Sequence, residues 1–370
     1  MRFFATRLNG DGTEEMISSD LPLSDWTLTR VISGGDTIAG SIKPEILSLK
    51  ADDGNPLLQA WSTAVYAEEE GDIASGGIVQ PGSPAKGSTM TVDAAGFSLY
   101  PTGQGYDGAM DFIEVDTLDI FRHIWAHLQG HPYGNLGMKL GTEKSGVLIG
   151  EELEEVKFEA EGEEVAFDRG PFRLAWWLAT DLGERIGDLL EAGGFEYRER
   201  HAWRERGDGI DHRIDFGVPR IGRRRHDIHF MLGDNLVAEP TYTIEDYASE
   251  IVMLGAGEGR TSRVGRAARS GEKRLRRHVT LSDRALDNLS MAAKAAATEL
   301  EGRTGMITPT QIQVRGSLHD DTLPDPGDEV LLKTHDRGWH AREEGLWVRV
   351  MSVTTSAKSS VATCDVHAVD

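Results

Sequence analysis

Three histidines spaced four residues apart are the first residues whose type and spacing could do chemistry. His123, His127 and His131 stand at positions i, i+4 and i+8, and two imidazoles four apart on one helical face can share a metal ion. However, Gly130 and Pro132 predict that the helix ends before His131. No HExxH glutamate accompanies the histidines, and no other carboxylate or cysteine cluster points at them. We therefore expect ordinary surface or capping histidines and no metal site.

A glycine-rich stretch, residues 255–259 (GAGEG), follows a predicted strand, as a phosphate-binding loop does. A dinucleotide site needs a helix N-terminus directly after the glycines, whereas an arginine-rich stretch follows here. The sequence contains no GxxxxGK[ST] or GxSxG motif, and its 61 acidic residues make chance pairs of carboxylates inevitable. We therefore predict no cofactor and no catalytic residue.

Two groups of basic residues could bind a negatively charged partner. One is the run Arg223, Arg224 and Arg225, which could contact phosphates or carboxylates. The other is a segment of eight basic residues between positions 257 and 277, and it includes Arg260, Arg263, Arg266 and Arg269. The formal net charge of -22 opposes a protein that binds nucleic acid with its whole surface. Pairing with carboxylates of the same chain or of a sister subunit is favoured, and sequence-specific nucleic-acid binding is not expected.

The length of 370 residues predicts two or three domains, each large enough for its own core. The only cysteine, Cys364, has no partner in the chain and is expected to be a buried thiol. No stretch has the pattern of a signal peptide or the length of a transmembrane helix. The 43 glycines predict many turns between short strands.

The elements that must position these residues are mostly short strands. Alternating patterns between residues 1 and 101 predict five or more strands, which form a small barrel or sandwich. One helix is predicted near residues 117–129, and a second near residues 181–192 with Gly193-Gly194 at its end. Residues 151–164 hold eight glutamates and one lysine, and are predicted to be an exposed loop or a weak hairpin.

Residues 171–203 are predicted to form a strand, a helix and a returning strand. The alternation of residues 172–177 predicts that Trp176 and Trp177 point to opposite faces of the first strand. At most one of the two indoles then enters the same core. The other is expected under a different element or at an interface, where tryptophan is enriched.

The fold class is predicted to be α+β and β-rich, with two small barrel-like β domains and intervening domains that contain helices. The predicted boundaries are residues 1–100 for the first barrel, 101–203 for an α+β domain, 204–256 with 307–370 for the second barrel, and 257–306 for an insertion. This insertion holds a long mobile basic loop and a helix that ends at Gly302. Because the loop lacks apolar residues, we expect it to become ordered only against an acidic neighbour.

Most of the chain resembles the minor tail proteins of long-tailed phages of actinobacteria, which are related to baseplate-hub or tail-tip-hub proteins. The resemblance runs through residues 171–203 and several other stretches. These are PLLQAWSTAVYAEEEGDIASGGIV, AAGFSLYP, VDTLDIFRHIWAHLQGHPYGNLG, DFGVPRIGRRRHDIHF, YASEIVMLGAGEGR and LWVRVMSVTTS. None of them is a catalytic signature, so the resemblance implies an architectural role and no reaction.

The resemblance implies a structural virion protein of the phage tail tip that is made in the bacterial host cytoplasm. It implies a homotrimer whose barrels form a ring that continues the tail tube and closes or supports its distal end for host attachment and DNA delivery. The implied partners are the distal tail protein or tail-tube ring, the tape-measure protein and other minor tail proteins. The alternative is a cell-wall-degrading hydrolase that uses paired carboxylates. The interface candidates are Trp176, Trp177, Arg223, Arg224, Arg225, Arg260, Arg263, Arg266 and Arg269.

Overall fold

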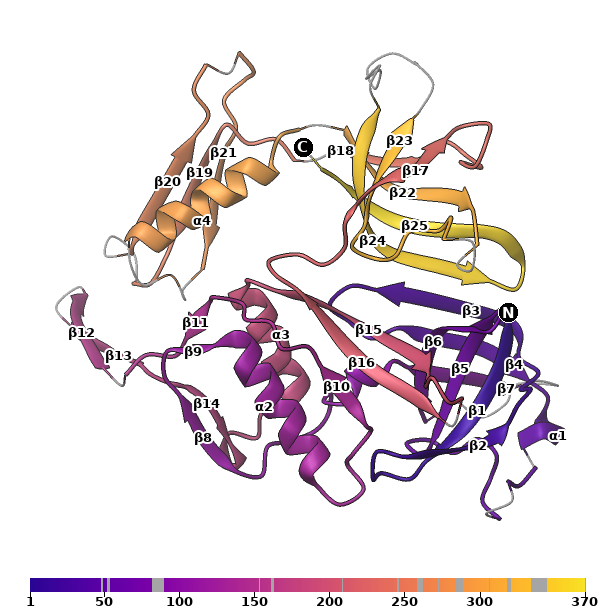
Figure 1. Ribbon diagram of the computed structural model, residues 1–370. Coiled ribbons are helices and arrows are strands. Elements are labelled where there is room, and N and C mark those ends of the chain that lie inside the picture. Colours follow the sequence, from indigo (N-terminus) through magenta and orange to yellow (C-terminus); the bar gives the residue numbers. More distant parts are fainter. Residues whose placement is uncertain are drawn as a thin grey trace. The chain divides into compact units, whose positions relative to one another are not determined.

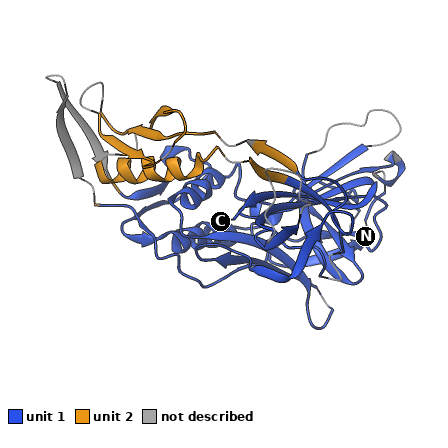
Figure 2. Ribbon diagram, turned by 90° about the horizontal axis from the view of Figure 1, so that it is seen from above, with its two compact units in different colours: residues 1–151, 171–240, 311–370 blue, residues 152–170, 241–310 orange. Residues whose placement is uncertain are grey.

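The computed structural model forms two compact units (Figure 2). Unit 1 holds residues 1–151, 171–240 and 311–370, and unit 2 holds residues 152–170 and 241–310. The described residues are 1–47, 49–51, 54–81, 90–152, 154–160, 163–207, 209–244, 246–257, 262–271, 273–283, 286, 289–305, 307–317, 321–333 and 345–369. Strands outnumber helices in them, which confirms the predicted β-rich α+β class. No helix among them is long and apolar enough to cross a membrane.

The N-terminal strands of unit 1 form an antiparallel sheet in the order β3-β4-β7-β6-β5-β1-β2 (Figure 1). Alternate residues, such as Phe3, Leu28 and Val65, share one buried cluster. We call this sheet with its core the first barrel, after the barrel-like domain that the sequence predicts here. The elements are β1 (Arg2–Leu8), β2 (Glu14–Ser18), β3 (Ser24–Val31), β4 (Thr37–Ile42), α1 (Pro44–Leu47), β5 (Thr63–Glu69), β6 (Asp72–Val79), β7 (Met90–Ala95) and η1 (Phe97–Leu99).

Strands β1 and β5 are buried on both faces. Phe3 belongs to the core of the first barrel, whereas its neighbour Phe4 belongs to a second, larger core. The Phe4 ring lies 5.0 Å from the ring of Tyr66 on β5 and 5.0 Å from that of Trp203. Because successive side chains of a strand point to opposite faces, these two strands form a wall between two cores.

The second core belongs to the middle part of unit 1, where both predicted helices are confirmed. Asp116 caps the first helix by accepting a hydrogen bond from the Leu118 amide at 2.9 Å. The cap of the second is Asp181. The elements are β8 (Ala109–Phe112), β9 (Val115–Asp116), α2 (Thr117–Gly130), β10 (Met138–Leu140), β11 (Leu148–Ile149), β14 (Phe172–Ala175), η2 (Trp176–Leu178), α3 (Leu182–Ala192), β15 (Glu196–Trp203) and β16 (Ile210–Gly217).

The C-terminal strands form a second barrel-like sheet. Strand β17 pairs in parallel with β23, and β24 and β25 continue the sheet to β22. Leu236 bridges to Leu232 at the end of β17 and to Val314 on β22, so the strands surround their core. Cys364 is a free, buried thiol in this core, as predicted. The strands are β17 (Arg224–Met231), β22 (Ile307–Arg315), β23 (Glu329–Lys333), β24 (Leu346–Ser356) and β25 (Ser359–Ala368).

The two barrels share one continuous sheet. Strand β3 of the first barrel pairs antiparallel with β24 of the second, from Val31 opposite Ser352 to Thr27 opposite Ser356. Thr29 and Thr354 join their hydroxyl groups at 3.0 Å across this pairing. The barrels are therefore fixed edge to edge by backbone hydrogen bonds.

Unit 2 contains a three-stranded sheet with one helix. The helix residues Ala296 and Leu300 form a small core with Ile251 and Met253 of the central strand. The elements are the hairpin β12 (Glu154–Ala160) and β13 (Glu163–Arg169), then β18 (Thr241–Ile244), β19 (Glu250–Leu254), β20 (Val264–Ala268), β21 (His278–Ser282) and α4 (Leu289–Gly302).

Two expectations about this part of the chain were wrong. Residues 264–268 of the predicted mobile loop form β20, which pairs antiparallel with β19 because the segment has a buried strand beside it. The strand predicted before residue 256 is β19, and it pairs with β20 and β21, outside the second barrel. Sequence alternation identified this strand but carried no information about its partners.

We predict that Phe4→Ala destabilises the protein by about 3 to 5 kcal/mol, because it leaves a cavity in a wall that is packed on both sides. Met16→Ala on β2 is the matched control, since the Met16 side chain is 45% exposed and its loss should change stability by less than about 0.5 kcal/mol. Urea unfolding followed by tryptophan fluorescence measures both. Equal effects of the two substitutions would contradict the two-core role of β1.

Candidate functional site

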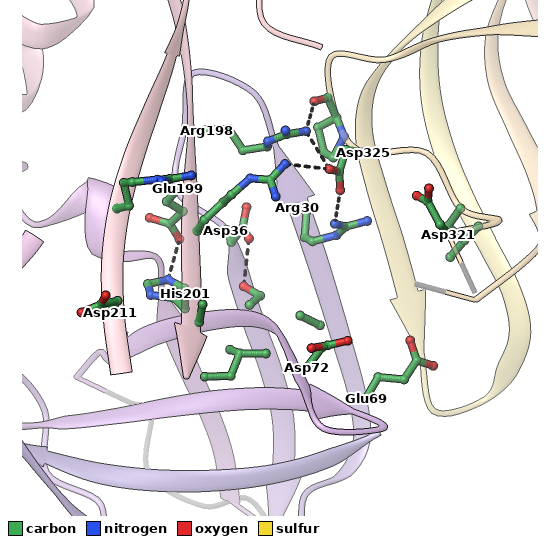
Figure 3. Close-up of a pocket in the computed structure, with 18 of the residues that line it drawn as sticks. Arg30, Asp36, Glu69, Asp72, Arg198, Glu199, His201, Asp211, Asp321 and Asp325 are labelled. Carbon is green, nitrogen blue, oxygen red and sulfur yellow. Dashed lines mark hydrogen bonds and ion pairs between the residues drawn. The ribbon is translucent and has the colours of Figure 1, made fainter. Parts of the chain in front are cut away.

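A charged cavity of about 550 Å³ lies in unit 1, where the two barrels and the hairpin β15–β16 meet (Figure 3). Arg30 comes from β3, Arg198 and Glu199 come from β15, and Asp325 comes from the segment between β22 and β23. Strand alternation places Arg198 and Arg200 on one face of β15, and Glu199 and His201 on the other. The site is thus assembled from segments that are far apart in the sequence.

The carboxylate of Asp325 forms ion pairs with three arginines. Its Oδ1 accepts a hydrogen bond from Arg30 at 2.8 Å, and its Oδ2 lies 3.1 Å from both Arg198 and Arg200. Arg198 also donates to the carbonyl of Pro326 at 3.1 Å. Burial acts to raise the pKa of Asp325, but the positive charges of the arginines outweigh it and hold the pKa below its usual value. Asp325 therefore remains charged and holds the first barrel, the hairpin and the second barrel together.

Arg349 makes a second junction between the hairpin and the second barrel. This β24 residue forms an ion pair with Glu196 at the start of β15, with one contact of 2.7 Å. It also donates to the carbonyls of Ile221 at 3.0 Å and Gly327 at 3.2 Å. Its side chain is 9% exposed, so the planar guanidinium is used as a buried connector.

Two acidic side chains are buried behind the arginines. Asp36 accepts hydrogen bonds from Ser75 at 2.9 Å and from the Val31 amide at 3.1 Å, and Glu199 accepts one from the Ser98 amide at 2.8 Å. Burial, aided by the charge of Glu199, raises the pKa of Asp36 to about 8. Burial likewise raises the pKa of Glu199. At least one of the two therefore keeps its proton near neutral pH.

Gly96 permits the close approach of these groups. A Cβ atom at this position would lie 2.2 Å from Glu199 Oε1 and 2.6 Å from the Asp36 amide nitrogen. Sequence reasoning missed Asp36, Glu199 and Asp325 as partners. Two features of the sequence could have indicated this site: Gly96 before Phe97, and Glu199 between two arginines on β15. Neither feature identifies the segment that the site residues contact.

A network of histidines continues the polar interior. His201 and His212 face each other across β15 and β16 with their Nδ1 atoms 2.8 Å apart, and His212 Nε2 lies 3.1 Å from Glu14. Glu14 also accepts a hydrogen bond from Tyr66 at 2.8 Å. Burial, with the charge of His212 adding to it, lowers the pKa of His201. These contacts join β15, β16 and β2 within the polar interior.

The predicted cluster at Arg223 to Arg225 pairs within its own chain, one of the two expected outcomes. The Arg225 side chain is 3% exposed and contacts Asp227 at 2.7 Å, Asp321 at 2.9 Å and Asp328 at 3.5 Å. Arg224 pairs with Glu329 at 2.7 Å and lies over the Trp347 ring. Arg223 donates its backbone amide to Asp328 at 3.0 Å. Arg224 and Arg225 thus stabilise the second barrel.

The basic residues of the later segment belong to unit 2. Arg266 lies on β20, 4.0 Å from Glu250, and Arg263 is exposed before this strand. Arg269 donates to the carbonyl of Ala248 at 3.3 Å. Arg260 lies outside the described residues.

Both tryptophans of the predicted strand lie on the surface of unit 1. Strand β14 ends at Ala175, and residues 176–178 form the 3-10 helix η2, so the predicted alternation through Trp177 is wrong. Trp176 is 66% exposed and Trp177 is 53% exposed, and their rings lie 5.5 Å apart, edge to face. Leu178 and Met110, the latter on the adjoining strand β8, are also exposed. We call the consecutive exposed residues Trp176, Trp177 and Leu178 the tryptophan patch.

The helical histidines separate into two environments. His123 Nε2 hydrogen-bonds the Tyr106 hydroxyl at 2.8 Å. His127 and His131 instead approach Asp107, at 3.2 Å and 3.6 Å. The expectation that no carboxylate points at these histidines was therefore wrong. This contact could not be predicted from the sequence, because Asp107 lies twenty residues before His127 in an irregular segment.

No protein-family model and no curated protein matches the chain. Among solved structures, the 43 kDa tail protein of prophage MuSo2 from Shewanella oneidensis is similar with a TM-score of 0.59 and 15% identity, over 100% of this chain and 98% of that one. Prophage tail protein gp18 from Listeria monocytogenes gives a TM-score of 0.55 and 12% identity, over 100% and 95%. A chain of the Francisella PdpA-VgrG complex gives 0.53 and 7%, over 99% and 57%.

At these identities the similarity establishes the fold. The matches to the two prophage proteins include both barrels, the middle part and unit 2, because they cover the whole chain. This chain therefore has the fold of phage tail proteins, as the resemblance in its sequence implied.

Proposed function

We propose that this chain is a structural protein of a phage tail tip, and that three copies form a hub ring which continues the tail tube. The observation that carries the proposal is the fold similarity to prophage tail proteins over 100% of the chain. The virion tail is the proposed location. The distal tail protein or tail-tube ring, the tape-measure protein and other minor tail proteins are the proposed partners.

The arrangement of the two barrels supports a trimer. Their edge-to-edge pairing through β3 and β24 gives each chain two barrel-like modules in a defined relation. Three such chains present six modules, so a three-fold ring can match a six-fold tube. This match requires that the two barrels of a chain keep their relative orientation. The arginines around Asp325 and the Arg349 to Glu196 ion pair supply that rigidity.

The charge of the chain fits the same role. A net charge of -22 repels the phosphate backbone of DNA. A conduit with such walls would let DNA pass without binding it, which suits delivery of the genome into the host.

The tryptophan patch is the proposed contact surface of unit 1. Trp176 and Trp177 are among its large exposed apolar side chains, and tryptophan is enriched at protein interfaces and in their binding hot spots. Arg263, Arg266 and Arg269 are proposed as the contact residues of unit 2, with acidic partner surfaces.

No observation favours a cell-wall hydrolase. Of the acids that line the cavity, Asp36 and Glu199 are buried, and Asp325 is neutralised by arginines. We propose that the chain does not hydrolyse host cell walls, and a turbidity assay on actinobacterial walls tests this.

We predict that the purified protein, alone or extracted from virions, has three times the mass of one chain in multi-angle light scattering. The double substitution Trp176→Ala/Trp177→Ala should raise the trimer dissociation constant by roughly tenfold or more, because it removes interface anchors. Leu148→Ala is the matched control, since Leu148 is an exposed apolar residue of unit 1 outside the patch. A monomer in virion extracts contradicts the proposed trimeric hub. A trimer whose dissociation constant is unchanged by the double substitution rejects only the proposed role of the tryptophan patch.

The buried acids predict how the stability of the junction depends on pH. The pKa of Asp36 and of Glu199 is raised in the folded state. Their contribution to the free energy of unfolding is therefore complete at pH values below their unfolded-state pKa, near 4, and is lost as the pH rises through about 8. Between pH 5 and 8 this pair therefore lowers the free energy of unfolding as the pH rises.

Asp36→Asn should remove roughly half or more of this fall in stability, because the amide stays neutral and no longer repels Glu199. Thermal unfolding at several pH values measures the difference from the wild type. Asp20→Asn, at an exposed position, is the control and should follow the wild-type curve. A wild-type curve for Asp36→Asn would show that the pair does not titrate in this range.

A further inference from the structure

The last turn of α2 and the segment before β8 bring three potential metal ligands to one point of unit 1. His127 lies in the final turn of the helix, and His131 is its C-cap residue. Asp107 precedes β8, which begins at Ala109. The cluster is partly accessible, because the Asp107 side chain is 70% exposed and the His131 side chain is 42% exposed.

The distances among the three ligand atoms fit a tetrahedral metal ion. His127 Nε2 lies 3.2 Å from Asp107 Oδ1, His131 Nε2 lies 3.6 Å from the same oxygen, and the two nitrogens are 3.3 Å apart. Metal bonds of about 2.1 Å in a tetrahedron place neighbouring ligand atoms about 3.4 Å apart. All three separations lie close to that value and exceed the usual length of a hydrogen bond, about 2.9 Å.

The surroundings of the cluster favour a cation. The C-terminal end of α2 carries the negative pole of the helix dipole, and Asp107 adds a formal negative charge. A neutral imidazole is the form that binds a metal. The Tyr106 ring packs 4.2 Å from the His127 ring, between their centroids, and restricts its orientation.

We propose that Asp107, His127 and His131 bind one divalent transition-metal ion of the zinc class, with a fourth position open to water. Two imidazoles and a carboxylate suit this class of ion. The ion would tie the segment before β8 to the end of α2. This site reverses the expectation from sequence that the helical histidines bind no metal, since Asp107 supplies a third ligand and the C-cap keeps His131 beside His127.

The test uses the purified full chain, freed of metal with a chelator, and Co²⁺ as the probe, because tetrahedral Co²⁺ absorbs visible light strongly. We expect one Co²⁺ to bind per chain and added Zn²⁺ to displace it. His131→Ala and Asp107→Asn should each weaken Co²⁺ binding by roughly tenfold or more, since two ligands remain. His229→Ala changes an exposed histidine of β17 and should bind like the wild type.

Thermal unfolding with and without Zn²⁺ separates loss of the site from loss of the fold. His131→Ala should unfold at the wild-type temperature without metal and lack the Zn²⁺-dependent rise that the wild type shows. Wild-type Co²⁺ affinity in His131→Ala and Asp107→Asn, or no Co²⁺ bound by the wild type, overturns the proposal. The three side chains would then be a hydrogen-bonded cluster only.

Discussion

The structure of unit 1 depends on one buried charge balance, the carboxylate of Asp325 among three arginines. Arg30 and Arg198 have side chains that are 12% and 13% exposed, so neither can be solvated freely. Without the carboxylate, partly buried positive charges would face one another, and the cost of an uncompensated buried charge is several kcal/mol. The contact between the two barrels and the hairpin β15–β16 therefore requires the carboxylate of Asp325.

A second constraint is the double burial of β1 and β5. One face of each strand closes the first barrel, and the other supports the helices and the hairpin of the middle part. Strand β1 therefore has large side chains on both faces: Phe3 packs in one core and Phe4 in the other. The consequence for the site is direct, because β15 packs on this wall and carries Arg198 and Arg200 toward Asp325 of the second barrel.

Local patterns in the sequence predicted most elements but few of their contacts. Gly130 and Gly193 marked the ends of helices, because caps depend on neighbouring residues. The alternation of a strand, by contrast, does not specify its partner strands, so β19 was assigned to the wrong sheet. For the same reason the ligand set around Asp107 and the arginines of Asp325 could not be found. The net negative charge of the chain predicted only that Arg224 and Arg225 pair with carboxylates.

The pairing of β3 with β24 also has a consequence for synthesis of the chain. Strand β3 ends at Val31, whereas its partner begins at Leu346, so the ribosome makes most of the chain before the two can meet. Until then the first barrel has an unpaired edge, and such edges invite pairing with other chains. Thr27 and Thr29 on β3 and the charged side chain of Arg30 make this edge polar. A charged side chain on an edge strand opposes pairing with other chains before the last strands are made.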